Sequence, residues 1–94
     1  MESAAEAAAM LKQMAHEGRL LVLCHLALEG EMSAGELTRA VGLQQSALSQ
    51  HLARLREAGL VATRRDATTI HYRLADPNAA RILETLKDIY CPKP

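Results

Sequence analysis

The chain has 94 residues, 49% of them hydrophobic, and its eleven basic and eleven acidic side chains give a formal net charge of zero. This length supports one domain with a thin core, and because Phe and Trp are absent, aliphatic side chains must build that core, which favours packed helices. No stretch approaches the roughly 20 uninterrupted apolar residues of a membrane span. The alanine-rich start also lacks the basic segment of a secretory signal, so we expect a soluble, cytoplasmic protein with no membrane partner.

Apolar residues at helical spacing predict two helices in the first third of the chain. The first spans about residues 3–15 and the second about residues 17–28, where Gly30 stops it. The apolar stripe of the second helix consists of Leu20, Leu23, Cys24 and Ala27.

A short helix and a longer helix follow, joined at a glycine. Ser33 and Glu36 form a capping box, in which each side chain binds the backbone N–H of the other residue. This box opens a short helix that Gly42 closes, and a longer helix spans residues 44–58. Its inward face is formed by Ala47, Leu48, Leu52 and Leu55. The pair is typical of a helix-turn-helix over about residues 33–58.

The pattern then changes to two short strands and a last helix. Residues 60–75 hold two runs of β-branched and aromatic side chains with a turn at Asp66–Thr68, which predicts a hairpin, or wing. Asp76 and Pro77 form an N-cap and N1 pair for a helix over about residues 77–91. We therefore expect a mainly α fold with a small β-hairpin wing, a winged helix-turn-helix, as a single DNA-binding domain over residues 1–94.

The outward face of the helix over residues 44–58 is polar. The outward residues are Gln45, Ser46, Ser49, Gln50 and Arg54. Gln and Ser can bond to base edges in the major groove, while Arg binds guanine or phosphate. Because a helix-turn-helix places the first turns of its second helix nearest the bases, we expect the Gln and Ser side chains to read bases. His51 is expected to reach a phosphate.

Basic residues gather locally despite the zero net charge. Between positions 54 and 73 these residues are Arg54, Arg56, Arg64, Arg65 and Arg73. Phosphates respond to charges within roughly 8–10 Å, so this local excess matters more than the total. In the wing, Arg64 and Arg65 with Thr68 and Thr69 suit contacts with the DNA backbone or minor groove. The alternative that both faces are simply solvated remains open.

A known family resembles this chain over most of its length. The stretch ELTRAVGLQQSALSQHLARLREAGLVATRRDATTIHYRL, which begins at Glu36, resembles the helix-turn-helix and wing of the ArsR/SmtB family of bacterial repressors. SALSQHLARLREAGLV is its most specific part, and MAHEGRLLVLCHL, from Met14, extends it upstream. The resemblance implies a homodimer formed through the first and last helices. Such a dimer binds a palindromic operator in double-stranded DNA and leaves it when an inducer is sensed.

Many members of that family sense metals, so metal ligands at the matching positions of this chain would indicate a metal sensor. In the arsenic-sensing branch the metalloid site resembles a Cys-x-Cys pair on the helix before the turn. The corresponding stretch of this chain reads ELTRAVG and contains no cysteine. Other branches place His and carboxylate pairs on the last helix, which here contains no histidine. The four histidines lie on different elements without helical pairing: His16, His25, His51 and His71. We therefore predict no metal site and no cofactor.

Cys24 and Cys91 remain as candidates for sensing. Their positions resemble the thiol- and persulfide-sensing branch of the family, which carries one cysteine at each place on elements that the fold brings together. The resemblance implies a disulfide or polysulfide bridge, formed by reactive sulfur species or oxidants, that lowers DNA affinity. In a reducing cytosol the dithiol is the resting form.

Other interpretations stay open. Cys24 lies on an apolar stripe, where a lone cysteine is usually a small core residue, and Cys91 near the terminus is as well explained as an incidental thiol. A metal- or metalloid-responsive repressor would use both cysteines with His25. Winged helices also serve as protein-interaction modules, which the zero net charge is consistent with. No spacing of nucleophile, base and orienting group suggests an enzyme.

Overall fold

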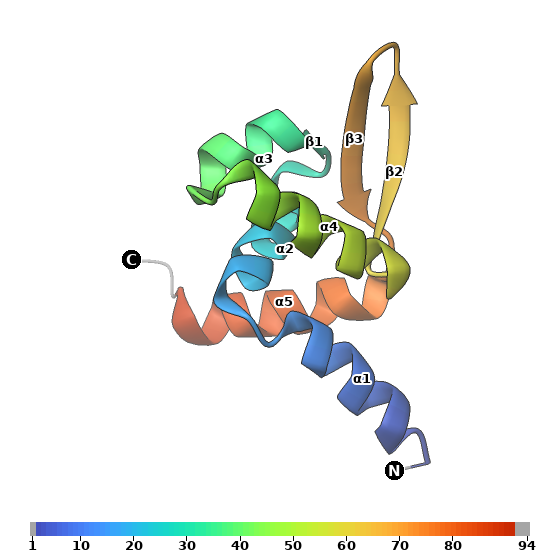
Figure 1. Ribbon diagram of the computed structural model, residues 1–94. Coiled ribbons are helices and arrows are strands. Elements are labelled where there is room, and N and C mark those ends of the chain that lie inside the picture. Colours follow the sequence, from blue (N-terminus) through green and yellow to red (C-terminus); the bar gives the residue numbers. More distant parts are fainter. Residues whose placement is uncertain (1, 92–94) are drawn as a thin grey trace.

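The computed structural model describes residues 2–91, and over that range it has five helices and one three-stranded antiparallel sheet (Figure 1). The helices are α1 Ala4–Met14, α2 Glu17–Glu29, α3 Ala34–Val41, α4 Gln45–Glu57 and α5 Pro77–Tyr90. The strands are β1 Met32–Ser33, β2 Val61–Asp66 and β3 Thr69–Leu74. The predicted winged helix-turn-helix is confirmed. The predicted range of 1–94 includes residue 1 and residues 92–94, which lie outside the described residues.

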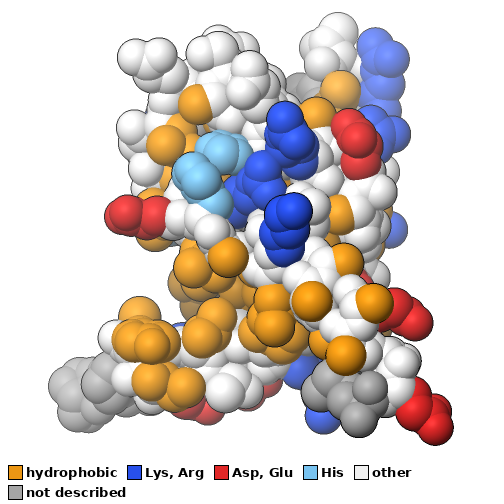
Figure 2. Space-filling view, turned by 60° about the horizontal axis from the view of Figure 1, so that its bottom comes forward, with side chains coloured by type: hydrophobic (Ala, Val, Ile, Leu, Met, Phe, Trp, Pro, Cys, Tyr) orange, Lys and Arg blue, Asp and Glu red, His pale blue; other side chains and the backbone are white. Residues whose placement is uncertain are grey.

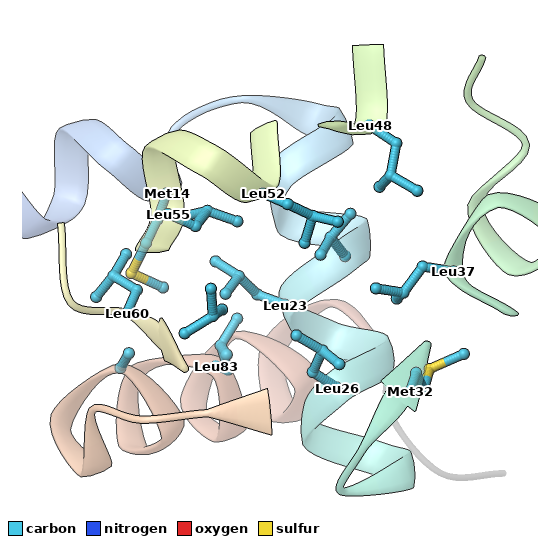
Figure 3. Packing of buried hydrophobic residues seen from close by; sticks show 13 residues of the cluster. Met14, Leu23, Leu26, Met32, Leu37, Leu48, Leu52, Leu55, Leu60 and Leu83 are labelled. Carbon is cyan, nitrogen blue, oxygen red and sulfur yellow. The ribbon is translucent and has the colours of Figure 1, made fainter. Parts of the chain in front are cut away.

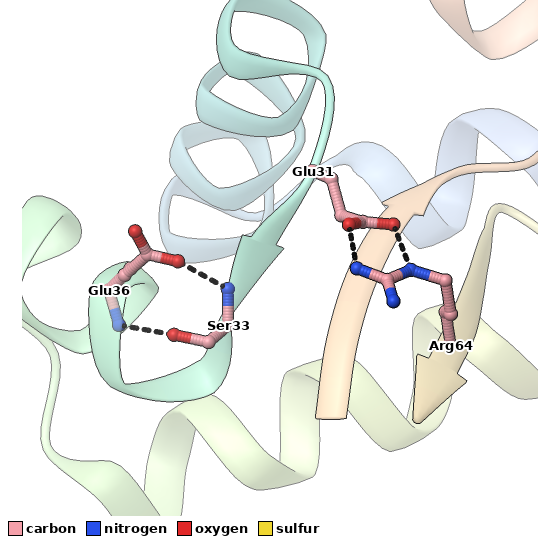
Figure 4. A network of polar contacts seen from close by, with 4 residues as sticks. All are labelled: Glu31, Ser33, Glu36 and Arg64. Atoms are coloured by element: carbon pink, nitrogen blue, oxygen red, sulfur yellow. Dashed lines mark hydrogen bonds and ion pairs between the residues drawn. The ribbon is translucent and has the colours of Figure 1, made fainter. Parts of the chain in front are cut away.

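The turn between α3 and α4 follows from local sequence. The Glu36 N–H donates to Ser33 Oγ (3.1 Å) and the Ser33 N–H donates to Glu36 Oε1 (2.9 Å), so the predicted capping box begins α3 (Figure 4). Gly42 ends α3 with a φ of 72°, a left-handed conformation that glycine adopts without steric cost. At the start of α4, Gln44 is extended but its side chain makes no capping hydrogen bond. α4 therefore depends on its buried face more than on its cap.

The wing is a hairpin of β2 and β3, and β3 also pairs with β1, a strand that the sequence analysis did not predict. β2 and β3 pair from Val61 opposite Leu74 to Asp66 opposite Thr69, and Figure 1 shows them projecting away from the helices. β1 pairs with β3, placing Ser33 opposite His71. Two residues are too short to show an alternating pattern, so β1 could not be predicted. Ser33 thus both pairs with the wing and caps α3, which ties the two elements together.

The core is aliphatic, as the composition predicted (Figure 3). On α4 the predicted inward residues Leu48, Leu52 and Leu55 are all buried. On α2 the predicted stripe is wrong in part, because Ala27 is exposed, Leu20 and Cys24 are half-buried, and other α2 residues are buried instead. The buried residues of α2 are Gly18, Val22, Leu23 and Leu26. α2 is the central helix and packs against all four other helices and β3, so more than one side of it is covered.

Apolar side chains also remain exposed on three of the helices. The large ones on α1, α2 and α5 are Leu11 (51% exposed), Leu21 (41%), Leu28 (63%), Ile89 (61%) and Tyr90 (76%). Figure 2 shows hydrophobic side chains gathered over the lower part of one face. Such a continuous apolar surface is typical of a protein interface. Within the described residues, no helix is long and apolar enough to cross a membrane.

Candidate DNA-binding surface and cysteine pair

α4 presents a polar face opposite its buried one. Its exposed polar residues include all five that the sequence placed there: Gln45, Ser46, Ser49, Gln50 and Arg54. The buried leucines on the other side fix the rotation of α4 about its axis, because turning it would expose them to water. The amide and hydroxyl groups are therefore held outward on a rigid helix, where they are free to bond to another molecule.

His51 differs from its neighbours on α4 because it is half-buried and already bonded. Arg19 on α2 donates its Nε–H to His51 Nδ1 (3.2 Å), and the rings of His16 and His51 lie 4.5 Å apart between centroids. Burial, followed by the charges of His16, Arg19 and Arg54, lowers the pKa of His51 below its ordinary value. The fold therefore pairs two histidines that the sequence left on separate elements. Among residues 2–91, no three His, Cys, Asp or Glu side chains form a group that could hold a metal ion.

The two arginines predicted for the wing have different surroundings. Arg64 donates from Nη2 to Glu31 Oε1 (2.7 Å) and from Nε to Glu31 Oε2 (3.2 Å), in a two-contact ion pair (Figure 4). The hydrogen bond from Arg64 is the main reason that the pKa of Glu31 is lowered. Arg65 bonds only to the carbonyl of Ala67 at the turn (3.2 Å). Thr68 and Thr69 are exposed there. Of the two arginines predicted to contact DNA from the wing, Arg64 is thus neutralised, whereas Arg65 near the tip forms no ion pair within residues 2–91.

Several basic side chains lie beside the histidines on one face of the molecule. Figure 2 shows Lys and Arg side chains next to the pale blue histidines on the half of this face away from the hydrophobic patch. The Arg54 charge also acts on His51, so α4 adds to this cluster. Of the arginines expected to form a local basic surface, Arg54 therefore lies near this pair of histidines.

The two cysteines lie on helices that pack together. Cys24 is half-buried on α2, and Cys91 is exposed at the C-cap of α5. Both are free thiols. Burial raises the pKa of the Cys24 thiol above its ordinary value, and the charge of a Cys91 thiolate raises it further. The pair therefore combines an accessible thiol with a shielded one, as a thiol that attacks and a thiol that resolves would require.

Three residues in these sites gave no signal in the sequence. Arg19, Glu31 and His16 reach partners 32 to 35 positions away in the chain, because only the packing of α2 against α4 and the pairing of β3 with both β1 and β2 bring them together. Spacing rules within a helix or strand cannot detect contacts of this kind.

The sequence of this chain is similar to those of known bacterial regulatory proteins. The family model described as "Bacterial regulatory protein, arsR family" matches residues 16–63, from the start of α2 into the wing. The HTH-type transcriptional regulator YgaV of Escherichia coli strain K12 is 52% identical over 90 residues, covering 96% of this chain and 91% of YgaV. The biofilm growth-associated repressor of Agrobacterium fabrum is 51% identical over 88 residues, covering 94% of this chain and 74% of that protein.

A solved structure agrees in detail with this fold. The structure of reduced HlyU from Vibrio cholerae superposes with a TM-score of 0.91 and 47% identity, covering 96% of this chain and 94% of that one. That protein is named a transcriptional activator, while the Agrobacterium relative is named a repressor. The relatives of this chain thus include both a named activator and a named repressor of transcription.

Proposed function

The chain belongs to the arsR family of bacterial regulatory proteins and is a DNA-binding transcriptional regulator, and we propose that it acts as a homodimeric repressor that binds a palindromic operator and is switched by a bridge between Cys24 and Cys91. The observation that carries this proposal is that one half-buried and one exposed free thiol lie on α2 and at the end of α5, two helices that pack against each other. The bacterial chromosome lies in the cytoplasm, so the protein is expected to act there.

In the proposed complex α4 enters the major groove. Gln45, Ser46, Ser49 and Gln50 bond to base edges from the first turns of α4, which is the part of such a helix that comes nearest the bases. Arg54 and His51 contact phosphates. In the wing, Arg65, Thr68 and Thr69 contact the backbone or the minor groove, and each added charge contact increases the salt dependence of binding. Arg64 joins them only if it leaves its ion pair with Glu31.

The exposed apolar surface supports the homodimer. Leu11 on α1 and the pair Ile89 and Tyr90 on α5 belong to the two helices expected to form the interface. A thin core gains burial when a second copy covers such side chains. A twofold dimer presents two copies of α4, which must match half-sites about one DNA turn, or roughly 34 Å, apart.

The switch needs only chemistry that two thiols can supply. With hydrogen peroxide, the Cys91 thiolate attacks one oxygen and releases water after proton transfer, which leaves a sulfenic acid. Cys24 then attacks the Cys91 sulfur, forms the disulfide and releases a second water. Cys91 meets the oxidant first because it is exposed, and Cys24 resolves the product.

Reactive sulfur species lead to the same bridge. A persulfide transfers its outer sulfur to Cys91 and leaves as a thiol, and Cys24 then attacks the inner sulfur and expels hydrogen sulfide. If both cysteines become persulfides, they condense to a trisulfide with loss of hydrogen sulfide. Each route balances with the persulfide as the only oxidant.

The bridge would act through geometry. It ties the end of α5, at the proposed interface, to α2, which packs against α4. The bridge would change the separation of the two reading helices. A coupling free energy of only about 1–3 kcal/mol between bridge formation and operator binding changes operator affinity about 5- to 150-fold. The experiment is a gel shift with a palindromic promoter fragment, using reduced protein and protein treated with an organic persulfide, peroxide or arsenite. Release by arsenite alone would replace the thiol switch with metalloid sensing.

A further inference from the structure

Arg19 joins three helices through one guanidinium group. From α2 it donates Nη1–H to Gln13 Oε1 on α1 (3.0 Å) and to the Gln13 carbonyl (3.3 Å). Its Nε–H is donated to His51 Nδ1 on α4 (3.2 Å). α1 is a helix of the proposed interface and α4 is the proposed reading helix. Arg19 is therefore a direct polar link between these two helices.

This bond also determines where His51 carries its proton. A guanidinium group only donates hydrogen bonds, so the His51 Nδ1 that accepts from Arg19 carries no proton. The neutral ring then carries its proton on Nε2, which leaves Nε2–H as a donor for another group. His16 is held in the same way, because its Nδ1 accepts from the Gly18 N–H (3.0 Å) at the start of α2. The adjacent rings thus both use Nδ1 inside the protein.

We propose that Arg19 is a positioning residue for DNA binding, which holds His51 as the Nε2–H tautomer and fixes α4 relative to α1. This inference rests on the proposed function, since it assigns His51 the role of a neutral donor to a DNA phosphate. The two copies of α4 in the dimer are held in register partly by this contact. Arg19 itself acts through His51 rather than by touching DNA.

The groups around His51 explain why the contact depends on the neutral ring. His51 faces His16 from the segment before α2, Arg19 from α2 and Arg54 on its own helix. Protonation would place an Nδ1–H against the Arg19 Nε–H, so the hydrogen bond would break. The link between α1 and α4 is therefore expected to weaken when His51 takes up a proton.

The first measurement is the tautomer of His51 in the wild-type dimer, read from the ¹⁵N shifts of its ring at neutral pH. A protonated Nε2 and a bare Nδ1 support the proposal, and a protonated Nδ1 overturns it. This measurement needs neither a variant nor DNA.

The second measurement is a mutant cycle on operator affinity. Arg19→Gln is made in the wild type, in His51→Asn, whose Oδ1 can still accept from Arg19, and in His51→Ala, which cannot accept. We expect roughly tenfold weaker binding in the first two backgrounds and less than twofold in the third. Lys12→Gln, which removes a nearby exposed charge on α1, should change affinity less than Arg19→Gln in every background.

Equal losses from Arg19→Gln in all three backgrounds would overturn the positioning role, because Arg19 would then act without His51. If the wild type itself fails to bind any palindromic fragment, the proposed function fails. The same cycle is then read from melting temperatures, where equal effects in His51→Asn and His51→Ala overturn the link between Arg19 and His51.

Discussion

The thiol of Cys24 on α2 lies near enough to Cys91, at the end of α5, for the charge of a Cys91 thiolate to raise the pKa of Cys24. Burial of Cys24 is the larger cause of the same shift. The relationship connects α2, which packs against the proposed reading helix α4, to the end of α5. The difference in exposure between the two sulfur atoms leads to the first prediction.

Cys91 should react with an alkylating agent before Cys24 does. It is exposed, whereas Cys24 is shielded and its raised pKa leaves less thiolate near neutral pH. Time-resolved mass spectrometry with iodoacetamide measures both rates. In Cys91→Ser the pKa of Cys24 should fall but stay above the ordinary value of about 8.5, because burial remains. Faster labelling of Cys24 near pH 7 would contradict this order of reaction.

Substitutions on α4 should divide into two classes. Gln50→Ala and Ser49→Ala should each lower affinity for the operator about 5- to 150-fold while leaving binding to random DNA unchanged, because base contacts carry sequence information. Arg54→Gln should weaken binding to the operator and to random DNA alike and reduce the salt dependence of DNA binding by about one charge. Titrations on operator and random duplexes at several salt concentrations measure this. If Gln50→Ala weakens both duplexes equally, Gln50 contacts the backbone.

Glu31→Gln should free Arg64 within β2 of the wing. The pair is partly exposed, so the melting temperature should change by only a few degrees. The freed guanidinium can then bind a phosphate, which should steepen the salt dependence of DNA binding by about one charge. Glu29→Gln removes a nearby exposed carboxylate and serves as the control. An unchanged salt slope in Glu31→Gln would mean that Arg64 has no phosphate within reach.

Acid should destabilise the fold through His51. Its pKa is lowered in the folded protein, chiefly by burial and then by the charges of His16, Arg19 and Arg54. In the unfolded chain His51 has a pKa of about 6.5 and therefore binds a proton more readily than in the folded protein. The stability that the neutral ring provides is complete above about pH 6.5 and is lost as the pH falls through the lower folded-state value. Melting temperatures should decline less between about pH 7 and pH 5 in His51→Asn than in the wild type, and parallel curves would rule this out.

Local rules predicted most of the fold from the sequence. The Ser33–Glu36 box, the glycine at position 42 and the Asp76 cap, which accepts from the Asn78 N–H (2.8 Å), all form as expected. The leucines of α4 have a helical period, so its outward face could also be identified. These features depend on residues a few positions apart, which is the range over which sequence patterns carry information.

Contacts between distant elements escaped prediction. β1 is too short for a pattern, and α2 buries more than one side because its neighbours surround it. The pairs Glu31–Arg64 and His16–His51 form only after the chain has folded. Arg64, one of the two wing arginines expected to contact DNA, is therefore neutralised, and His51, expected to contact a phosphate, is already bonded through Nδ1.

The most direct test compares operator binding by the reduced protein and by the protein carrying a Cys24–Cys91 bridge, whose formation is verified by intact mass. We predict that the bridged wild type binds a palindromic operator at least about fivefold more weakly than the reduced form. Cys24→Ser, given the same persulfide treatment, should keep the affinity of the reduced protein. Equal affinity of the reduced and bridged wild type would contradict the proposed switch.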